Sequence, residues 1–250
     1  MKHPWPITFL RTVDSTNNYA NSLLTDILNI RECVISASHQ TNGRGQKGNS
    51  WISQENQNLT FSVVLNTSFL KAENQFALSQ AISLGIVDFL NKHTIVAKVK
   101  WPNDILVKNS KIAGILIENG IMGEFLSHSI VGIGLNINQC QFDELNYTAT
   151  SMKLILEKDL ECNLLLEELL NCLNNRIDGL KSKRLQAIHH EYICHVFNFN
   201  QWARFSVGKE IIEAKIIDIT SQGELVILSA DGKTKKYLFQ EIKIIFDLNQ

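Results

Sequence analysis

Apolar residues recur at two spacings along the first part of the chain, and these spacings separate helices from strands. The apolar positions between Tyr19 and Ile27 follow the triplet DST at 14–16 at helical spacing. A side-chain oxygen of this triplet can satisfy free amides in the first helical turn, so a helix is expected to begin here. Residues 74–92 also have helical spacing and are expected to pack on a sheet.

Short runs of apolar and β-branched residues, bounded by polar or glycine positions, predict the strands. Two of these runs flank the turn at 108–111, which indicates a β-hairpin. The expected strands are residues 33–38, 59–65, 95–99, 105–107, 112–117 and 129–138.

The pattern changes near residue 198. Before this point, Ser151 can cap a short helix, and residues 163–180 form a leucine-rich helical segment. Beyond it, short runs typical of strands are broken by glycines at roughly ten-residue spacing, which is typical of a small β-barrel. We therefore expect two domains, comprising residues 1–197 and 198–250.

The composition is that of an ordinary soluble globular protein. Hydrophobic residues make up 44% of the 250 residues and charged residues 20%, which is enough for a substantial core. The net charge of −1 argues against broad nucleic-acid binding, because such binding requires a basic excess. No apolar run reaches about 18 residues, and the N-terminal MKHPWPITFL does not read as a signal peptide. The five cysteines form no C-x-x-C pair, which fits free thiols in the cytoplasm.

The stretch TNGRGQKGNSW at 41–51 contains three glycines with the spacing G-x-G-x-x-G, which also occurs in dinucleotide-binding turns. In such a turn a helix opens at the third glycine, and an acidic residue follows about 20 positions later. Here no helical periodicity follows Gly48, and residues 66–68 are uncharged. A Rossmann fold is therefore disfavoured.

The same loop carries two cations among its glycines, Arg44 and Lys47. Glycines let successive backbone amides converge on an anion, and a guanidinium binds carboxylates or phosphates as a planar fork. The loop can thus bind anions, although a solvated surface loop is the alternative. Asn103 and Asp104 follow a strand and a proline, where they can cap a turn or bind a divalent cation or a nucleotide hydroxyl. Lys111 lies at the mouth of an apolar strand, where a lone lysine is usually solvated.

Five motifs, taken together and in this order, resemble those of biotin protein ligases. They are DSTN at 14–17, GRGQKGNSW at 43–51, KWPND at 100–104, KIAGIL at 111–116 and GIGLNIN at 132–138. The similarity extends from about residue 8 to the end of the chain. It implies an α+β fold with a central mixed sheet flanked by helices, as in class II synthetases and lipoate ligases, and a C-terminal SH3-like β-barrel.

The resemblance implies a reaction in two steps. Biotin protein ligases join biotin to ATP with Mg²⁺, giving biotinyl-5′-adenylate and pyrophosphate, and then transfer biotin to one lysine of a biotin carboxyl-carrier domain. The biotin carboxylate and the α-phosphate are both negative, so cations must compensate their repulsion. Arg44 and Lys111 are the expected catalytic cations, and they are expected to converge in one cavity between the biotin carboxylate and the α-phosphate. Asp104 is expected to accept a proton from the incoming lysine or to serve the metal.

The resemblance also implies which residues bind each substrate. Ser15, Thr16 and Gln40 are expected to hydrogen-bond the ureido ring, Trp51 to stack on or cover the adenylate, and Asn136 to contact the nucleotide. The biotin-binding set comprises Ser15, Thr16, Asn17, Gln40, Gly43, Arg44, Gly45, Gln46, Lys111 and Gly114. The ATP- or adenylate-binding set comprises Lys47, Asn49, Trp51, Asn103, Lys111 and Asn136. The glycine-rich loop is expected to be mobile in the free protein and to order over the adenylate, excluding water.

Two departures from the family pattern qualify these expectations. Many relatives carry a second arginine where this chain has Gln46, so Lys47 is expected to compensate in part and retention of the intermediate is in question. Bifunctional bacterial members have an N-terminal helix-turn-helix, whereas here the motifs start at Asp14, so a repressor role and DNA binding are disfavoured. Family members often pair through the central sheet, which leaves a homodimer formed on ligand binding open.

Other interpretations also fit parts of the sequence. A lipoate or octanoate ligase or transferase shares the catalytic fold, but the GRG loop together with KWPND favours biotin. Two non-catalytic roles are also disfavoured: a DNA-binding repressor lacks the helix-turn-helix expected for it, and an adaptor that uses the C-terminal barrel would not need both Arg44 and Lys111. His190, Cys194 and His195 have a spacing that a zinc site could use, but no further Cys/His pair lies nearby, so an ordinary helix surface is expected.

Overall fold

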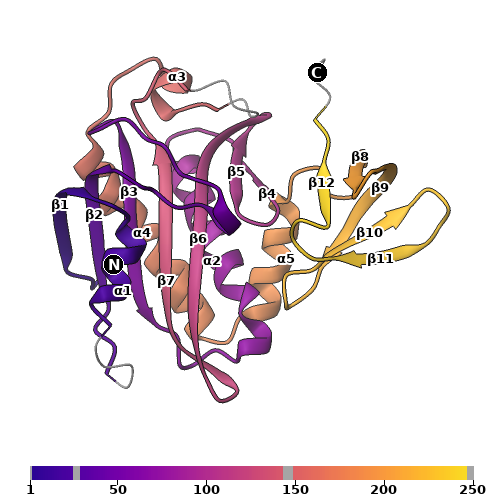
Figure 1. Ribbon diagram of the computed structural model, residues 1–250, viewed down its shortest axis with the longest axis horizontal. Helices are drawn as coiled ribbons and strands as arrows, with labels where there is room; N and C mark the ends of the chain where they lie inside the picture. Colours follow the sequence, from indigo (N-terminus) through magenta and orange to yellow (C-terminus); the bar gives the residue numbers. More distant parts are fainter. Residues whose placement is uncertain (1, 25–28, 143–148, 247–250) are drawn as a thin grey trace.

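A seven-stranded mixed sheet forms the centre of the molecule (Figure 1). The computed structural model describes residues 2–24, 29–142 and 149–246. The strands are β1 (Ile7–Val13), β2 (Cys33–Gln40), β3 (Asn58–Asn66), β4 (Lys98–Lys100), β5 (Asp104–Val107), β6 (Ser110–Met122) and β7 (Phe125–Asn136). Their order in the sheet is β1-β2-β3-β7-β6-β5-β4. Strands β1 and β2 run parallel, and the other neighbouring strands run antiparallel.

Helices cover both faces of this sheet. On one face, α2 (Phe76–Lys92) and α4 (Cys162–Lys181) pack against each other and against the sheet, as Figure 1 shows. On the other face, the short α1 (Thr16–Ser22) packs on β2, β3 and β7. Strand β3 lies between the two layers and is buried along almost its whole length. The strand expected at residues 59–65 is confirmed, but neither of its faces is open to solvent, because α1 covers the second face.

Most of the expected helices form, with two differences at α1. Helix α3 (Met152–Leu156) begins at the predicted cap, where the Ser151 hydroxyl accepts a hydrogen bond from the Leu154 amide at 3.2 Å. The predicted cap of α1 was wrong in detail, because Ser15 stands at the N-cap without making a side-chain capping bond. Helix α1 ends at Ser22, and Ile27 lies outside the described residues.

Two strands differ from the sequence interpretation. Strand β1 was missed because it lies at the sheet edge, where most of its residues are partly or fully exposed and the apolar signal is weak. Asp104 was expected beyond the sheet but begins β5, where it pairs with Lys100 of β4 across a tight turn. That turn contains the Trp101–Pro102 peptide bond in the cis form. The hairpin of β5 and β6 is confirmed.

The C-terminal strands form a second, antiparallel sheet beside β4 and β5 (Figure 1). They are β8 (Trp202–Val207), β9 (Glu210–Ile219), β10 (Leu225–Ser229), β11 (Thr234–Tyr237) and β12 (Ile242–Ile244), in the order β11-β10-β9-β8-β12. Residues of both sheets belong to one continuous core, which includes Val99 of β4 and Phe205 of β8. The Trp101 indole also donates to the Gly223 carbonyl at 2.9 Å. The division into domains at residue 198 stays a prediction.

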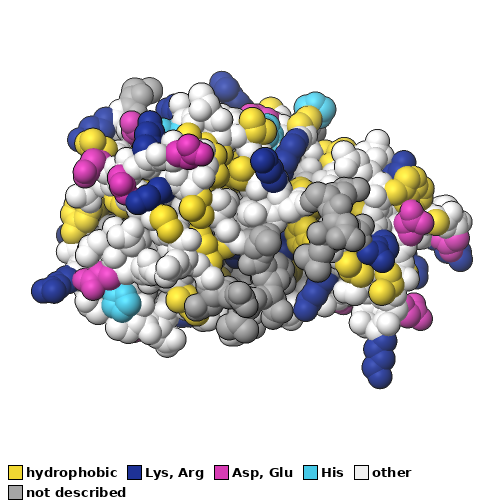
Figure 2. Space-filling view, turned by 90° about the horizontal axis from the view of Figure 1, so that it is seen from above, with side chains coloured by type: hydrophobic (Ala, Val, Ile, Leu, Met, Phe, Trp, Pro, Cys, Tyr) yellow, Lys and Arg dark blue, Asp and Glu magenta, His cyan; other side chains and the backbone are white. Residues whose placement is uncertain are grey.

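Surface charges are mixed in sign. On the face that Figure 2 shows, Lys and Arg side chains are interspersed with Asp and Glu, and uncharged atoms cover most of the area. Among the helices that the structure describes, none has the length and apolar composition needed to cross a membrane.

Three elements meet at Arg176, which lies on α4 near its C-terminal end. Its guanidinium donates to both oxygens of Asp88 on α2 and to both oxygens of Glu191 on α5 (Leu185–His195), at 2.5–2.6 Å. Bidentate, charge-assisted pairs of this kind fix side-chain geometry as well as adding energy. Hydrogen bonding from Arg176 lowers the pKa of Glu191 below its ordinary value.

Replacing Glu191 with glutamine is expected to lower the melting temperature by an amount that depends on pH. Because the folded pKa of Glu191 is depressed, its contribution is present above the unfolded pKa and is lost as the pH falls through the folded pKa. The difference in melting temperature between wild type and Glu191→Gln should therefore shrink as the pH falls below about 4.5. Glu55→Gln, at an exposed loop position, serves as the control. A difference that stayed constant with pH would contradict the assignment.

Candidate functional site

A cavity of about 790 Å³ lies over the sheet face that carries α1, next to the second sheet. Its walls come from the start of α1, the loop at 43–51, strands β5 to β7 and apolar residues of the C-terminal strands. Most of the residues singled out from the sequence line it. These are Ser15, Thr16, Asn17, Gln40, Arg44, Gly45, Gln46, Asn49, Trp51, Asn103, Asp104, Lys111, Gly114 and Asn136.

Gly43 is the one fully described residue of the expected set that does not line this cavity. Gly43 is buried beneath the loop, where its carbonyl accepts from the Trp51 amide at 2.9 Å. A Cβ at Gly43 would approach the Trp51 carbonyl oxygen to 2.3 Å, so the absence of a side chain there lets the loop close. The Lys47 side chain lies outside the described part of the structure.

Buried polar side chains form one end of the cavity. Ser15, Thr16 and Asn17 are each less than 5% exposed. The Gln40 carbonyl oxygen accepts from the Thr16 amide at 2.8 Å, and Asn17 Nδ2 donates to Glu118 Oε2 at 2.8 Å. Hydroxyls and amides held in fixed positions by such bonds can match the donors and acceptors of a polar ring.

Two residues that the sequence analysis missed support this polar end. The Ser62 hydroxyl on β3 lies 2.7 Å from Thr16 Oγ1 and 2.6 Å from Asn17 Oδ1. Gly132 on β7 allows Asn17 to approach, because a Cβ there would lie 2.3 Å from Asn17 Oδ1. Gly132 belongs to the GIGLNIN motif, so the available signal was the pair of glycines in an apolar strand.

The glycine-rich loop is a compact hairpin. Gly43 pairs with Trp51, Arg44 forms a bridge with Ser50, and the Gly45 amide donates to the Asn49 carbonyl at 2.7 Å. Glycine amides were expected to converge on an anion, but the Gly45 amide bonds within the loop instead. Only a single 3-10 turn, η1 (Gln46–Gly48), follows the second glycine, so the loop does not open a helix as a Rossmann turn does.

Trp51 packs on a pair of glycines in the floor of the cavity. Gly114 of β6 and Gly134 of β7 face each other across the two strands. A Cβ at Gly134 would lie 2.1 Å from the indole, and one at Gly114 would lie 3.1 Å from it. The indole Nε1 is buried and has no hydrogen-bond partner among the described residues. Trp51 is therefore held as a flat wall of the cavity, with a free donor.

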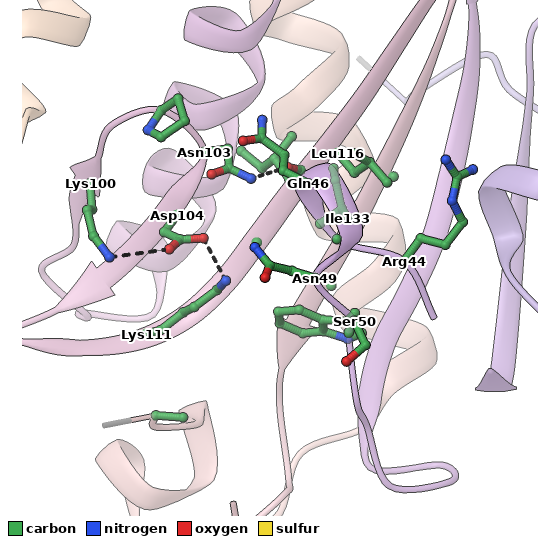
Figure 3. A pocket seen from close by; sticks show the side chains of 18 of the residues that line it. Arg44, Gln46, Asn49, Ser50, Lys100, Asn103, Asp104, Lys111, Leu116 and Ile133 are labelled. Carbon is green, nitrogen blue, oxygen red and sulfur yellow. Dashed lines mark hydrogen bonds and ion pairs between the residues drawn. The ribbon is translucent and has the colours of Figure 1, made fainter. Parts of the chain in front are cut away.

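Two lysines and a carboxylate form the charged end of the cavity (Figure 3). Lys111 Nζ lies 2.6 Å from Asp104 Oδ1, and Lys100 Nζ lies 3.7 Å from Asp104 Oδ2. The Lys111 ammonium also lies over the Trp51 ring, 5.5 Å from its centroid. Burial lowers the pKa of Lys100 below its ordinary value, and the Lys111 and Lys243 charges act in the same direction, while Asp104 opposes them. The cluster carries more positive than negative charge and so suits an anionic ligand.

Arg44 reaches the same cavity but directs its charge elsewhere. Its guanidinium donates to Glu118 Oε1 at 2.7 Å and to Asn18 Oδ1 at 2.8 Å. Figure 3 shows it pointing away from the cluster of Lys100, Asp104 and Lys111. The expectation that Arg44 and Lys111 line one cavity is met, whereas their charged groups form ion pairs with different carboxylates.

Two asparagines of the adenylate set use their amides within the protein. Asn103 Nδ2 donates to the Ile115 carbonyl at 2.7 Å, which joins the β4–β5 turn to β6. Asn136 Nδ2 donates to the Thr150 carbonyl at 3.0 Å. The side-chain carbonyl oxygen and the second N–H of each amide remain for a ligand.

The described residues do not build a metal site of their own. No group of three His, Cys, Asp or Glu side chains within 2–24, 29–142 and 149–246 is arranged to hold a metal ion. Asp104, the expected ligand, is already flanked by two ammonium groups. His190, Cys194 and His195 lie at the end of α5, where the His195 ring contacts the Glu191 carbonyl at 2.9 Å.

Comparison with known proteins identifies the class. A model of the biotin/lipoate A/B protein ligase family matches residues 9–136, just over half of the chain. The chain belongs to this family.

The relatives within the family include biotin ligases. The bifunctional ligase/repressor BirA of Bacillus subtilis is 27% identical over 210 residues, which cover 82% of this chain and 64% of that protein. The biotin–[acetyl-CoA-carboxylase] ligase of Mycobacterium tuberculosis is 32% identical over 123 residues, which cover 48% of this chain and 44% of that protein. The chain thus spans less than two thirds of the length of these relatives.

A solved structure matches nearly the whole chain. The biotin protein ligase of Aquifex aeolicus, in complex with biotin and ATP, aligns with a TM-score of 0.79 at 27% identity. The alignment covers 97% of this chain and 99% of that one. The predicted fold class, a mixed sheet with flanking helices and a second C-terminal sheet, is confirmed.

Proposed function

We propose that this chain is an ATP-dependent biotin protein ligase. It would activate biotin with ATP to biotinyl-5′-adenylate and transfer the biotinyl group to a lysine of a carrier domain. The observation that carries the proposal is that one cavity has both a buried polar end, at Thr16 and Asn17, and a cationic end, at Lys100 and Lys111. Family membership and the similarity to a ligase bound to biotin and ATP support the same function.

In the first step the biotin carboxylate attacks the α-phosphorus of ATP. A bond forms between the carboxylate oxygen and phosphorus, the bond to the β-phosphate oxygen breaks, and pyrophosphate leaves. Lys111, which pairs with Asp104 in the free protein, can pair with the reacting anions instead. Lys100 adds a second positive charge at the same end of the cavity. Fixed cations in a partly buried site stabilise charge more than water does, because they need no reorganisation during the reaction.

In the second step the amine of the acceptor lysine attacks the biotinyl carbonyl carbon. An amide bond forms, the bond to the AMP oxygen breaks, and a proton leaves the attacking nitrogen. Asp104 supplies a carboxylate in the same cavity and is our candidate acceptor for that proton. Mg²⁺, when present with ATP, would shield the phosphates. The carrier domain, a ligand-linked homodimer and the cytoplasmic location are parts of the proposal that rest on resemblance.

The polar end of the cavity favours biotin over lipoate. The ureido ring of biotin has two donors and an acceptor, whereas the dithiolane ring of lipoate has neither. Buried groups such as Asn17 and Thr16 would lose hydrogen bonds to water without replacement if they enclosed a dithiolane. Sites built to hydrogen-bond a polar group reject the analogue that lacks it, typically by a factor of about 10⁴ or more.

A labelling assay tests this function. The purified chain is incubated with ATP and a biotin carboxyl-carrier domain, together with either biotin or lipoate, and the carrier is weighed by mass spectrometry. We expect the mass of one biotinyl group on the carrier with biotin, and no addition when ATP is omitted. A carrier with its acceptor lysine changed to arginine is the control. Addition of lipoate without addition of biotin would overturn the proposal in favour of a lipoate ligase.

A further inference from the structure

Arg44 lies at the boundary between two cavities. It lines the large cavity and also a smaller one of about 180 Å³, whose other walls include Asn18, Glu118 and His128. Its guanidinium meets Glu118 at both ends of the carboxylate, with distances of 2.7 Å to Oε1 and 3.3 Å to Oε2. Asn18 Oδ1 accepts from it as well. In this arrangement the charge of Arg44 is directed toward the smaller cavity's walls.

Glu118 is connected to the polar end of the large cavity by a chain of hydrogen bonds. Glu118 Oε2, the oxygen that lies 3.3 Å from the Arg44 guanidinium, also accepts a hydrogen bond from Asn17 Nδ2 at 2.8 Å. Asn17 Oδ1 in turn lies 2.6 Å from the Ser62 hydroxyl. One carboxylate therefore contacts both Arg44, which the sequence resemblance assigns to the reaction, and the Asn17 amide at the polar end of the cavity.

We propose that Glu118 is a positioning residue that holds the Arg44 guanidinium away from the charged end of the large cavity until an anionic substrate replaces Glu118 as its partner. This inference rests on the proposed function. The carboxylate of biotin, and then the phosphate of the adenylate, would take the place of the Glu118 carboxylate as partner of the guanidinium. Glu118 keeps Asn17 in position during this exchange, because the hydrogen bond from Asn17 Nδ2 to Glu118 does not involve Arg44.

The exchange has a small energetic cost. The Arg44 and Glu118 side chains are 40% and 36% exposed, respectively. Ion pairs this accessible to water contribute little, because solvent screens them and the side chains lose freedom. Glu118 can thus retain Arg44 in the free protein without preventing its transfer to a substrate. The corresponding effect on substrate binding is about two- to five-fold.

Two substitutions at Glu118 separate its two contacts. Glu118→Gln removes the charge that holds Arg44 but keeps an oxygen for Asn17, whereas Glu118→Ala removes both. We expect Glu118→Gln to lower the KM for biotin about two- to five-fold with kcat unchanged, because the release of Arg44 favours the bound state and the transition state equally. We expect Glu118→Ala to raise the KM above that of Glu118→Gln. Glu73→Gln, which breaks an exposed pair with Lys71 at 3.8 Å, is the matched control and should change neither constant.

Limited proteolysis tests the contact between Arg44 and Glu118 independently of any ligase activity of the chain. Trypsin must take the Arg44 side chain into its own pocket to cut the Arg44–Gly45 bond, so pairing with Glu118 should protect that bond. We expect Glu118→Gln to accelerate cleavage after Arg44 in the absence of ligand, relative to wild type and to Glu73→Gln. Cleavage after Lys47 in the same loop provides an internal reference for general loosening of the loop.

The two measurements distinguish the possible failures. If Glu118→Gln leaves both the cleavage after Arg44 and the KM unchanged, or raises the KM as far as Glu118→Ala does, the holding role is wrong. If the carrier is never biotinylated but cleavage after Arg44 increases selectively, the contact is confirmed while the proposed function fails. Equal acceleration at Arg44 and Lys47 would also overturn the proposal, since it would indicate a loosened loop.

Discussion

Replacing Lys111 with alanine is expected to lower the rate of adenylate formation by about 10²–10³-fold, the usual loss when one preorganised contact to a developing charge is removed. The ammonium lies 2.6 Å from Asp104 at the charged end of the cavity and over the Trp51 ring. Without it, Lys100 is the remaining described cation at Asp104, at 3.7 Å. The carboxylate of biotin would then meet the α-phosphate with less compensation of their mutual repulsion.

The rate is measured as biotin-dependent exchange of labelled pyrophosphate into ATP, which reports the first step alone. Lys158→Ala, an exposed position outside the cavity, is the matched control and should retain the wild-type rate. Lys111→Arg keeps the charge but changes its shape, so partial activity is expected. A Lys111→Ala variant that is folded and exchanges pyrophosphate within a few-fold of wild type would show that Lys111 is not a catalytic residue.

Replacing Gly134 with alanine is expected to destabilise the protein by about 1–3 kcal/mol and to reduce ligation severely. The added Cβ would lie 2.1 Å from the Trp51 indole, a distance that forces the ring to move. Because Trp51 is a wall of the cavity and carries Lys111 over its face, its displacement changes the shape of the site and the position of the cation. Gly179→Ala on α4, which meets open space, is expected to leave the protein unchanged or slightly more stable.

A double-mutant cycle shows whether the clash is the cause. In the Trp51→Ala background the ring is absent, so Gly134→Ala should cost little additional stability. The free energy of unfolding is measured by chemical denaturation for the wild type, both single variants and the double variant. If Gly134→Ala costs the same in both backgrounds, the glycine is required for another reason and the packing argument is wrong.

The sequence predicted those elements whose residues are restricted by burial or by turn geometry. Helix α4 and the β5–β6 hairpin follow from periodicity and turn residues, because burial and turn geometry restrict what can stand there. The residues of the cavity could be gathered from five motifs because their order matches a known family. Spacing alone could not have brought Thr16 and Lys111 to one cavity, since 95 positions separate them along the chain and their proximity depends on the sheet order.

What the sequence could not show is which partner each charged group selects. Arg44 and Lys111 were expected to converge, but Arg44 forms an ion pair with Glu118 and Lys111 forms one with Asp104. Glu118 follows the apolar residues of KIAGIL, and a charged residue in that context could have indicated a functional role. Strand β1 escaped notice because an edge strand buries too little apolar surface to reveal its period.

The large cavity is bounded by both sheets, with Phe205, Leu225 and Ile242 of the C-terminal strands among its lining residues. A chain shortened at residue 197 would therefore lose one side of its own binding chamber and leave Val99 and Trp101 without their apolar cover. If such a fragment failed to bind ligands, the failure would therefore not show what the C-terminal strands contribute beyond enclosing the cavity. Any experiment on the role of the second sheet has to be made with single replacements in the intact chain.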